Sequence, residues 1–533
     1  MSPETILSRF ARFVAETPAA DIPERVLAKV RLQVLTSLTA ARFSHWHPMA
    51  KMALAAEKAG ARGGRKTSTV IATGDRLPAE NAACANAAYA MTLDFDDYML
   101  MGHTGYSAVL PALAYLERSN GTVGELLSTA AVTNEVMGRL SLACFLGPLN
   151  GQMWSYIHNL GGAAGACRAK GLDPDVTKNA MALSLYQPNF CLAPGFWHEG
   201  SKLLTSAVPL RAGLWAARYA EAGLSGPENI VEGPLGFFHF FAFTPVPEFT
   251  GDLGSAWLSD SLSYKRYPGT SYINAPVDAA LGALLAAGKK QVKDPGEVKR
   301  IAVDTTLLSY SLENVSKAQG RKEVDAIAVN FSVSLSVAYA LLRGDLAPDH
   351  FREDELSAFA DRIQALAARV KVRHDLALSA KTVSTFPMLG AVLAKANHRQ
   401  FSRLRDHLRA LNGPGDGSRS LAKTLAAPGF PGFVKNALKL AASRNRPIRL
   451  ADVPLENYPM LQSARVRVDW ASAPSTECEI PIPTGGSGTD DGARKAWVAE
   501  RTRRAFGKDP SPILALLEDP ETPVRDFVKA LVL

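Results

Sequence analysis

The sequence predicts a mainly α-helical protein, with a large helical domain followed by a smaller domain that mixes helices and strands. Apolar residues recur at helical spacing, interrupted by Gly and Pro loops, from the N-terminus to about residue 260. Alternation of apolar and polar residues at period two then begins at 297–306 and returns at 368–376, as expected of half-buried strands. A mixture of helix and strand of this kind is typical of a compact α+β domain.

Individual segments support this division. Residues 124–140 predict a helix on which Glu135 and Arg139, four residues apart, can pair. Small residues line one side of the helix predicted over 160–172, so a second helix can approach it closely. The apolar run 328–344 is long enough to predict a single buried helix.

Near the C-terminus, 463–471 and 476–483 predict a β-hairpin, and 493–507 predicts a return to helix. With 533 residues the chain is too long for a single core. We expect the following organisation: a helical domain over 1–265, the first part of the α+β domain over 266–380, a basic helical insertion over 381–455, the hairpin over 456–490, and C-terminal helices over 491–533 that return to either domain.

The composition is ordinary for a globular protein, with 47% apolar and 21% charged residues. No stretch reaches the roughly 18 apolar residues that a membrane span requires. The N-terminal pattern is an amphipathic helix with Glu4 and Glu16, which matches neither a signal peptide nor a transit peptide. We expect a cytoplasmic protein without a membrane partner.

The cysteines and short motifs predict no metal and no cofactor. Five cysteines lie far apart, at 84, 144, 167, 191 and 478, and no two form a CxxC pair. Zinc and iron–sulfur sites need clustered thiolates, so reduced thiols buried in helices are the favoured interpretation. The sequence also has no GxGxxG, GxxxxGKS/T or HExxH.

The formal charge of +8 comes from one segment. Between Lys381 and Leu450 there are thirteen Lys and Arg against Asp406 and Asp416, a net of +11, which leaves about −3 for the rest. A basic segment permits binding to nucleic acid or to a membrane surface. Its only aromatic residues are four phenylalanines, so base stacking would be poor, and we expect no nucleic-acid partner.

Several segments, in order along residues 20 to 380, resemble one known family, MmgE/PrpD. The strongest is ENAACANAAYAMTLDFDD (80–97), followed by His103 and VLPALAYLE (109–117); the others are 121–140, 201–227 and 264–281. The family includes 2-methylcitrate dehydratase, cis-aconitate decarboxylase and iminodisuccinate epimerase. The resemblance implies a large helical domain with a smaller α+β lid, a homodimer, and an active site between the two domains.

These reactions remove a proton or a carboxylate from carbon next to a carboxyl group, so negative charge develops in the transition state. Fixed cations and a positioned acid or base meet that need without metal. By resemblance, Lys202 and Lys265 match the family's two site lysines and Asp94 matches a site aspartate. His103 is the best candidate base, because imidazole titrates near neutral pH. These four residues are the predicted catalytic set.

Three aspartates fall within four residues, at 94, 96 and 97. Like charges this close raise one another's pKa, which suits a role in proton transfer. We expect at least one of them to cap a helix, and we expect Asp96 and Asp97 to be structural.

Other positions depart from the family pattern. Without a gap, family histidines fall on Thr104, Gln152 and Thr270, a threonine falls on Tyr98, and a tyrosine falls on Leu335. His158 lies near the missing histidine. We predict that Tyr98, Gln152, His158 and Thr270 contact the substrate.

The sequence therefore predicts a cofactor-independent lyase, of hydro-lyase type, that acts on a small carboxylic acid. Decarboxylation and epimerisation remain open within enzymes. A non-catalytic relative that binds a carboxylate remains open outside them.

Overall fold

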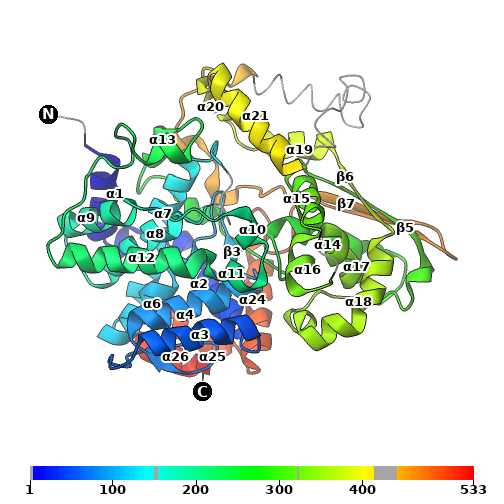
Figure 1. The fold of residues 1–533 in the computed structure, drawn as a ribbon, viewed down its shortest axis with the longest axis horizontal. Helices are drawn as coiled ribbons and strands as arrows, with labels where there is room; N and C mark the ends of the chain where they lie inside the picture. Colours follow the sequence, from blue (N-terminus) through cyan, green and yellow to red (C-terminus); the bar gives the residue numbers. More distant parts are fainter. Residues whose placement is uncertain (1–3, 149–153, 321–322, 413–437, 439–440, 533) are drawn as a thin grey trace. The chain divides into compact units, whose positions relative to one another are not determined.

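The computed structural model describes residues 4–148, 154–320, 323–412, 438 and 441–532, and the chain divides into two compact units (Figure 1). The first unit comprises residues 1–264, 449–457 and 490–533, and the second comprises 265–448 and 458–489. The chain therefore leaves the first unit and returns to it from the second.

Helices build most of the first unit, and its strands are only two residues long. The helices are α1 (Ile6–Glu16), α2 (Glu24–Phe43), α3 (Pro48–Gly60), α4 (Ala79–Thr92), α5 (Gly105–Ala108), α6 (Leu110–Ser119), α7 (Val123–Ala143), α8 (Ile157–Ala169), α9 (Pro174–Ser184), α10 (Ala193–Phe196), α11 (Glu199–Lys202), α12 (Leu204–Glu221), α13 (Phe237–Phe241), α24 (Asp491–Phe506), α25 (Ser511–Glu518) and α26 (Val524–Val532). The strands are β1 (Ser68–Thr69), β2 (Arg76–Leu77), β3 (Asp97–Tyr98) and β4 (Ser263–Tyr264), and they form the antiparallel pairs β1–β2 and β3–β4.

Helix α7 confirms the helix predicted over 124–140. Thr122 and Glu125 form a capping box at its start, so two backbone N–H groups of the first turn are satisfied. Within the helix, Arg139 lies 3.4 Å from Glu135, and both side chains are buried. Glu135 also accepts hydrogen bonds from the backbone of Leu258 and Ser259, which ties the helix to the segment before β4.

Helices α8 and α12 approach each other closely, as the small residues of 160–172 predicted. A Cβ atom on Gly162 would lie 2.7 Å from the carbonyl oxygen of Leu210. A Cβ atom on Gly213 would collide with the carbonyl oxygen of Asn159 and would lie 3.0 Å from Gly162 Cα. Glycine at both positions is therefore what allows the two backbones to touch.

The second unit has one mixed sheet covered by helices. Its helices are α14 (Ser271–Ala286), α15 (Leu307–Ala318), α16 (Ala326–Phe331), α17 (Val333–Arg343), α18 (Glu353–Ala367), α19 (Leu376–Val383), α20 (Leu389–Lys395) and α21 (His398–Asn412). Its strands are β5 (Val298–Thr305), β6 (Val370–His374), β7 (Ala464–Trp470) and β8 (Thr476–Ile480).

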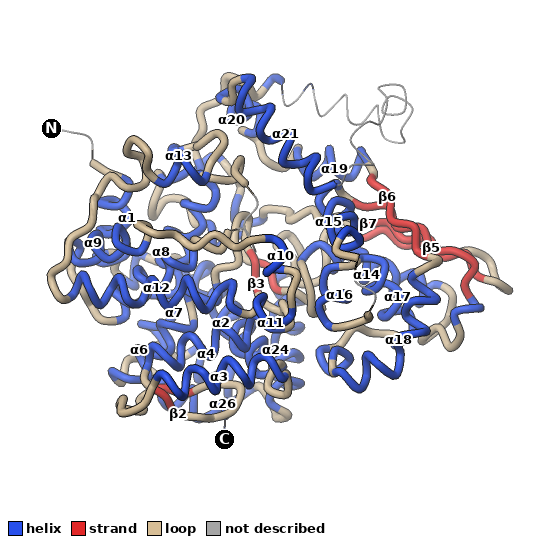
Figure 2. The backbone as a smooth tube through the Cα atoms, viewed as in Figure 1, coloured by secondary structure: helices blue, strands red, loops and turns tan. Residues whose placement is uncertain are grey.

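The strand order is β6-β5-β7-β8, with β5 parallel to β6 and the other neighbours antiparallel. Helix α14 packs against β7 and β8, and Figure 2 shows the strands gathered beside α14 and α17. The strands predicted at 297–306, 368–376, 463–471 and 476–483 are thus confirmed within a few residues at each end.

The single buried helix predicted over 328–344 was wrong, because two helices occupy that segment. Ser332 is extended, with φ −107° and ψ 118°, and separates α16 from α17. Its hydroxyl accepts a hydrogen bond from Leu335 N at 3.2 Å and lies 3.1 Å from Glu313 Oε2. The apolar pattern could not predict that the Ser332 side chain caps the start of α17, which ends α16 at Phe331.

All five cysteines are free: Cys84, Cys144 and Cys167 are buried, and Cys191 and Cys478 are half-buried. The expectation of reduced thiols in the interior holds fully for the first three. Across the residues that the structure describes, every helix is too short or too polar to cross a bilayer.

The α8–α12 crossing makes a prediction about stability. Gly213→Ala should lower the free energy of unfolding by about 1–3 kcal/mol, because the new methyl group overlaps Asn159 O and forces the helices apart. The matched control is Gly60→Ala, at the end of α3, where the nearest atom is 3.9 Å from the new Cβ. Urea unfolding of both variants checks this, and equal stabilities would contradict the packing argument.

Candidate active site

A buried turn between α4 and β3 carries three aspartates, Asp94, Asp96 and Asp97. Helix α4 ends at Thr92, and Asp94 then adopts the left-handed backbone conformation, with φ 52°. Asp97 starts β3, whose pairing with β4 fixes the far end of the turn. A buried carboxylate costs free energy unless it has charged or hydrogen-bonding partners, so each aspartate is described below by the partners of its side chain.

Asp96 is paired with His103. His103 Nδ1 lies 2.7 Å from Asp96 Oδ2 and 3.0 Å from the carbonyl oxygen of Asp97. A carbonyl oxygen and an ionised carboxylate can only accept, so Nδ1 carries the hydrogen and Nε2 keeps its lone pair. This arrangement orients a histidine as a base, in the way that a carboxylate orients the catalytic histidine of a hydrolase.

Asp94 is paired with Lys202. The ammonium lies 3.3 Å from Asp94 Oδ2, and each side chain is only 1% exposed. Lys202 is the last residue of the short helix α11, whose start is capped by His198 through a 3.1 Å bond from Gly200 N. The structure thus brings together Asp94 and Lys202, two residues of the predicted catalytic set. A third, His103, contacts the same turn through its hydrogen bond with Asp96.

Asp97 is held inside the first unit by α2. Gln33 Nε2 donates to Asp97 Oδ2 at 2.8 Å, and Ser37 lies 3.4 Å from the other carboxylate oxygen. Burial raises the pKa of Asp97 to about 6, and the neighbouring charge of Asp96 adds to the shift. These contacts are compatible with the structural role expected of Asp97, which stays a prediction.

His158 lies in the same interior. Its Nδ1 is 2.8 Å from Ser107 Oγ, and its ring meets the Tyr106 ring edge-on at 5.7 Å. Burial lowers the pKa of His158 to about 3, and the electrostatic interaction with His103 acts in the same direction. His158 is accordingly a neutral hydrogen-bonding group near pH 7 and cannot serve as a fixed cation.

The other predicted site residues are distributed over the chain. The Tyr98 ring lies 6.0 Å from the His103 ring. Lys265, which is buried, and Thr270, the residue before α14, belong to the second unit. Gln152 lies outside the described residues.

One prediction about the turn was wrong. None of its aspartates caps a helix: Leu93 ends α4, and the residue before α5 is Thr104, without a side-chain cap. Asp96 was expected to be structural like Asp97, but of the two it is its side chain that contacts the candidate base. Sequence spacing could not separate Asp96 from Asp97, since neighbouring residues in an irregular turn can point in any direction.

Three further residues of the site were missed: Gln33, Ser107 and Arg501. Gln33 lies in α2 among other buried polar residues, Lys29, Thr36, Ser37 and Thr39, and this group of polar residues within a buried helix was a usable signal for a polar contact. Ser107 and Arg501 gave no local signal. Arg501 is fully buried and reaches the turn from α24, about 400 residues away along the chain.

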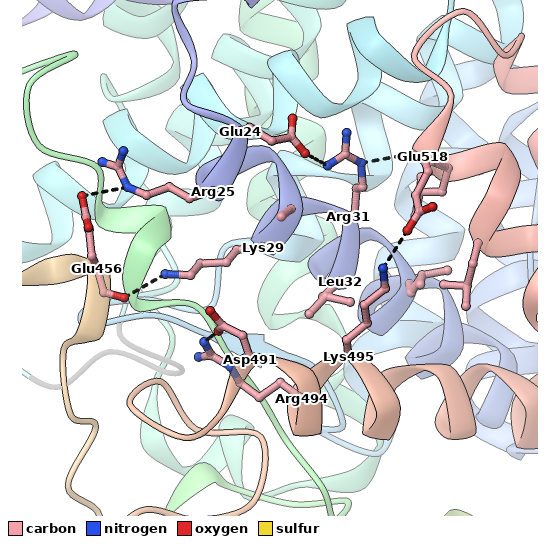
Figure 3. A pocket seen from close by; sticks show the side chains of 14 residues that line it. Glu24, Arg25, Lys29, Arg31, Leu32, Glu456, Asp491, Arg494, Lys495 and Glu518 are labelled. Atoms are coloured by element: carbon pink, nitrogen blue, oxygen red, sulfur yellow. Dashed lines mark hydrogen bonds and ion pairs between the residues drawn. The ribbon is translucent and has the colours of Figure 1, made fainter.

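Apart from this turn, the first unit has a cavity of about 510 Å³ among α2, α24 and α25 (Figure 3). Its rim carries ion pairs that join these elements: Arg31–Glu24 at 2.5 Å, Lys495–Glu518 at 2.7 Å and Arg25–Glu456 at 3.0 Å. It contains no predicted site residue. Within the described residues, no cluster of three His, Cys, Asp or Glu side chains could hold a metal ion.

The raised pKa of Asp97 predicts how stability depends on pH. Between about pH 4 and 6 the folded protein binds this proton more tightly than the unfolded chain, so stability falls as pH rises through that window. Two pKa units correspond to about 3 kcal/mol. Relative to wild type, Asp97→Asn should therefore gain about 2–3 kcal/mol between pH 4 and 6.5.

Urea unfolding across this pH range measures the difference, with the exposed Asp349→Asn as control. The same slope in wild type and Asp97→Asn would show that folding does not raise the pKa of Asp97.

Comparison with known proteins now adds to this geometry. The model of the MmgE/PrpD N-terminal domain matches residues 8–250, and that of the MmgE/PrpD C-terminal domain matches residues 267–408. The second match includes the first part of the basic segment that was expected to be an insertion. A search of curated proteins found no match. The two matches span most of the chain in the family's order, so the protein belongs to the MmgE/PrpD family, a family of dehydratase or lyase type.

Proposed function

We propose that the protein is a hydro-lyase that removes a proton next to a carboxyl or carbonyl group of a small carboxylic acid. The observation that carries the proposal is the Asp96–His103 pair. It holds Nδ1 as a donor and leaves Nε2 with a lone pair, as a general base requires.

In the proposed reaction His103 Nε2 takes the α-proton of the substrate. The electrons of the broken C–H bond form a carbon–carbon double bond, and the β-hydroxyl leaves as water after accepting a proton from the protonated His103, which regenerates the neutral imidazole. Negative charge builds up on the substrate carboxyl or carbonyl group during this step. Lys202 supplies a preorganised positive charge for it, and we assign the same role to Lys265.

Charge balance within the first unit favours a substrate with few carboxylates. The Lys202 ammonium is already close to Asp94, and Asp96 adds a second carboxylate to the same turn. His158 is neutral near pH 7, because burial lowers its pKa to about 3. A tricarboxylate would place three negative charges beside these carboxylates. A mono- or dicarboxylic acid with a carbonyl or ring group would place fewer there and would be repelled less.

The assignment of His103 as the base makes a prediction about activity. His103→Gln should lower the rate by about 10²–10⁴-fold, because glutamine cannot accept the proton. The measurement uses ¹H NMR in D₂O on a panel of mono-, di- and tricarboxylic acids, and follows deuterium exchange at the α-carbon together with product formation. The control is His239→Gln, at an exposed histidine of α13.

The products distinguish the remaining activities. Loss of water identifies the hydro-lyase, loss of CO₂ a decarboxylase, and inversion with exchange an epimerase. Exchange that persists at the wild-type rate in His103→Gln would exclude the assigned base. Binding of an acid with neither exchange nor product would identify a non-catalytic carboxylate binder.

We also propose that two copies associate through α12. Four large apolar side chains on one face of this helix are exposed: Leu204 (41%), Val208 (45%), Trp215 (47%) and Tyr219 (49%). Figure 1 shows α12 in green along the outside of the first unit. By ordinary side-chain areas they expose about 400 Å² of apolar surface, which is in the range of the largest apolar patch of a typical protein, and such patches are often functional.

The spacing of these residues fits a second copy of the same helix. In an antiparallel pair with a two-fold axis near Arg211, Leu204 faces Tyr219 and Val208 faces Trp215, so a small side chain meets a large one each time. Arg211 forms an ion pair with Glu57, so a neutral pair lies near the axis. Interfaces are a little over half apolar, so about 400 Å² implies roughly 700 Å² per partner, close to the usual 800 Å².

Trp215→Glu tests this surface. Wild type should elute at twice the chain mass of 57.0 kDa in light scattering, and the variant at the mass of one chain, because a carboxylate would be buried at the interface. The control is Leu285→Glu, at a residue of the second unit that is 77% exposed. A wild-type monomer, or a dimer that survives the substitution, would contradict the proposed interface.

A further inference from the structure

Arg501 contacts the turn that carries the three aspartates. It is fully buried, on the face of α24 that packs against α2. Its guanidinium donates to the carbonyl oxygen of Phe95, to Thr36 O at 3.0 Å and to Thr39 Oγ1 at 2.7 Å. Its Cζ atom also lies 3.5 Å from the centre of the Phe95 ring. Phe95 is the residue between Asp94 and Asp96, so Arg501 contacts the middle of the turn.

Burying a charged guanidinium costs free energy, which hydrogen bonds and nearby negative charges must offset. Burial lowers the pKa of Arg501 to about 9, and the negative charges of Asp96 and Asp97 act in the opposite direction. The attraction is mutual, since a cation that gains from these carboxylates also stabilises their ionised forms. The turn thus has a buried cation on each of two sides, Lys202 against Asp94 and Arg501 behind Asp96 and Asp97.

We infer that Arg501 is a positioning residue for the Asp96–His103 pair. Its guanidinium fixes the carbonyl group and ring of Phe95, and so the orientation of Asp96, the next residue. Its positive charge favours the ionised form of Asp96, which accepts the hydrogen bond from His103 Nδ1. The charged and titratable groups around Asp96 are Asp94 and Asp97 of the same turn, His103, Tyr106 of α5, His158 of α8 and Arg501 of α24. Its catalytic consequence rests on the proposed function, but its structural consequence does not.

Arg501 lies outside both family matches, which end at residues 250 and 408. The returning C-terminal segment therefore contributes to the site from a part of the chain that the family comparison does not cover. Removing this segment would remove a cation from the interior of the site, and not only an outer helix.

The test is the His103 Nδ1 proton, whose NMR signal moves far downfield when a carboxylate accepts its hydrogen bond. Histidine-labelled, deuterated protein gives signals from ten histidines, and His103→Gln identifies the relevant one by its loss. Three variants are compared with wild type: Arg501→Gln, Arg501→Lys and Arg494→Gln. The last is a matched control, because Arg494 is also buried on α24 but pairs with Asp491, beside which Figure 3 shows it, and donates to the carbonyl oxygen of Leu262.

Arg501→Gln should shift the Nδ1 signal upfield or broaden it through exchange with water, and Arg501→Lys, which keeps the charge, should restore much of it. Arg494→Gln should leave the signal in place although it also removes a buried arginine. An unchanged signal in folded Arg501→Gln, or an equal change in Arg494→Gln, would overturn the inference. Should Arg501→Gln fail to fold, Arg501→Lys decides: loss of the fork alone should still shift the signal measurably.

Where a substrate is turned over, Arg501→Gln should lower kcat by about 10–100-fold with little change in KM, because the base is misaligned while the binding groups stay, and Arg501→Lys should lower kcat less. A change in KM alone would point to a structural role and count against positioning. The NMR readout needs no substrate, so absence of turnover would count against the proposed function and leave this inference standing.

Discussion

The structure of the first unit depends on one constraint, the compensation of three carboxylates that are packed into a buried turn. Asp94, Asp96 and Asp97 lie within four residues, and each is nearly inaccessible to water. Ionised groups tolerate such burial only with charged or hydrogen-bonding partners. The partners come from elements far apart in sequence: Lys202 from α11, His103 from the loop before α5, Gln33 from α2 and Arg501 from α24.

This requirement explains why the surrounding helices are so closely packed and so rich in small residues. Helix α4, which leads into the turn, is buried on every side from Ala82 onward and contains seven alanines. Helices α8 and α12 touch through Gly162 and Gly213, which brings His158 and Lys202, on or beside these helices, towards the same interior. Small side chains thus make room for a polar network, and the network fixes how the helices meet.

The three aspartates differ in role because their surroundings differ, although their sequence context is nearly the same. Asp97 is held by neutral donors, and burial raises its pKa to about 6. Asp94 faces an ammonium, and Asp96 faces an imidazole. Such a division of labour among adjacent carboxylates is how one turn can combine structure, charge compensation and proton transfer.

By itself the sequence determined the class of fold, the strands of the second unit and the residue types of the site. Periodicity reports which face of an element is apolar, and the runs at 298–305, 370–374 and 464–470 carry that information locally. It failed at Ser332, where a side-chain cap outweighs apolarity, and at Asp96, whose partner could not be inferred from spacing. Only the tertiary structure decided which aspartate meets the histidine and that Arg501 stands behind them, because burial and long-range contacts, absent from any local pattern, choose the partner of each charge.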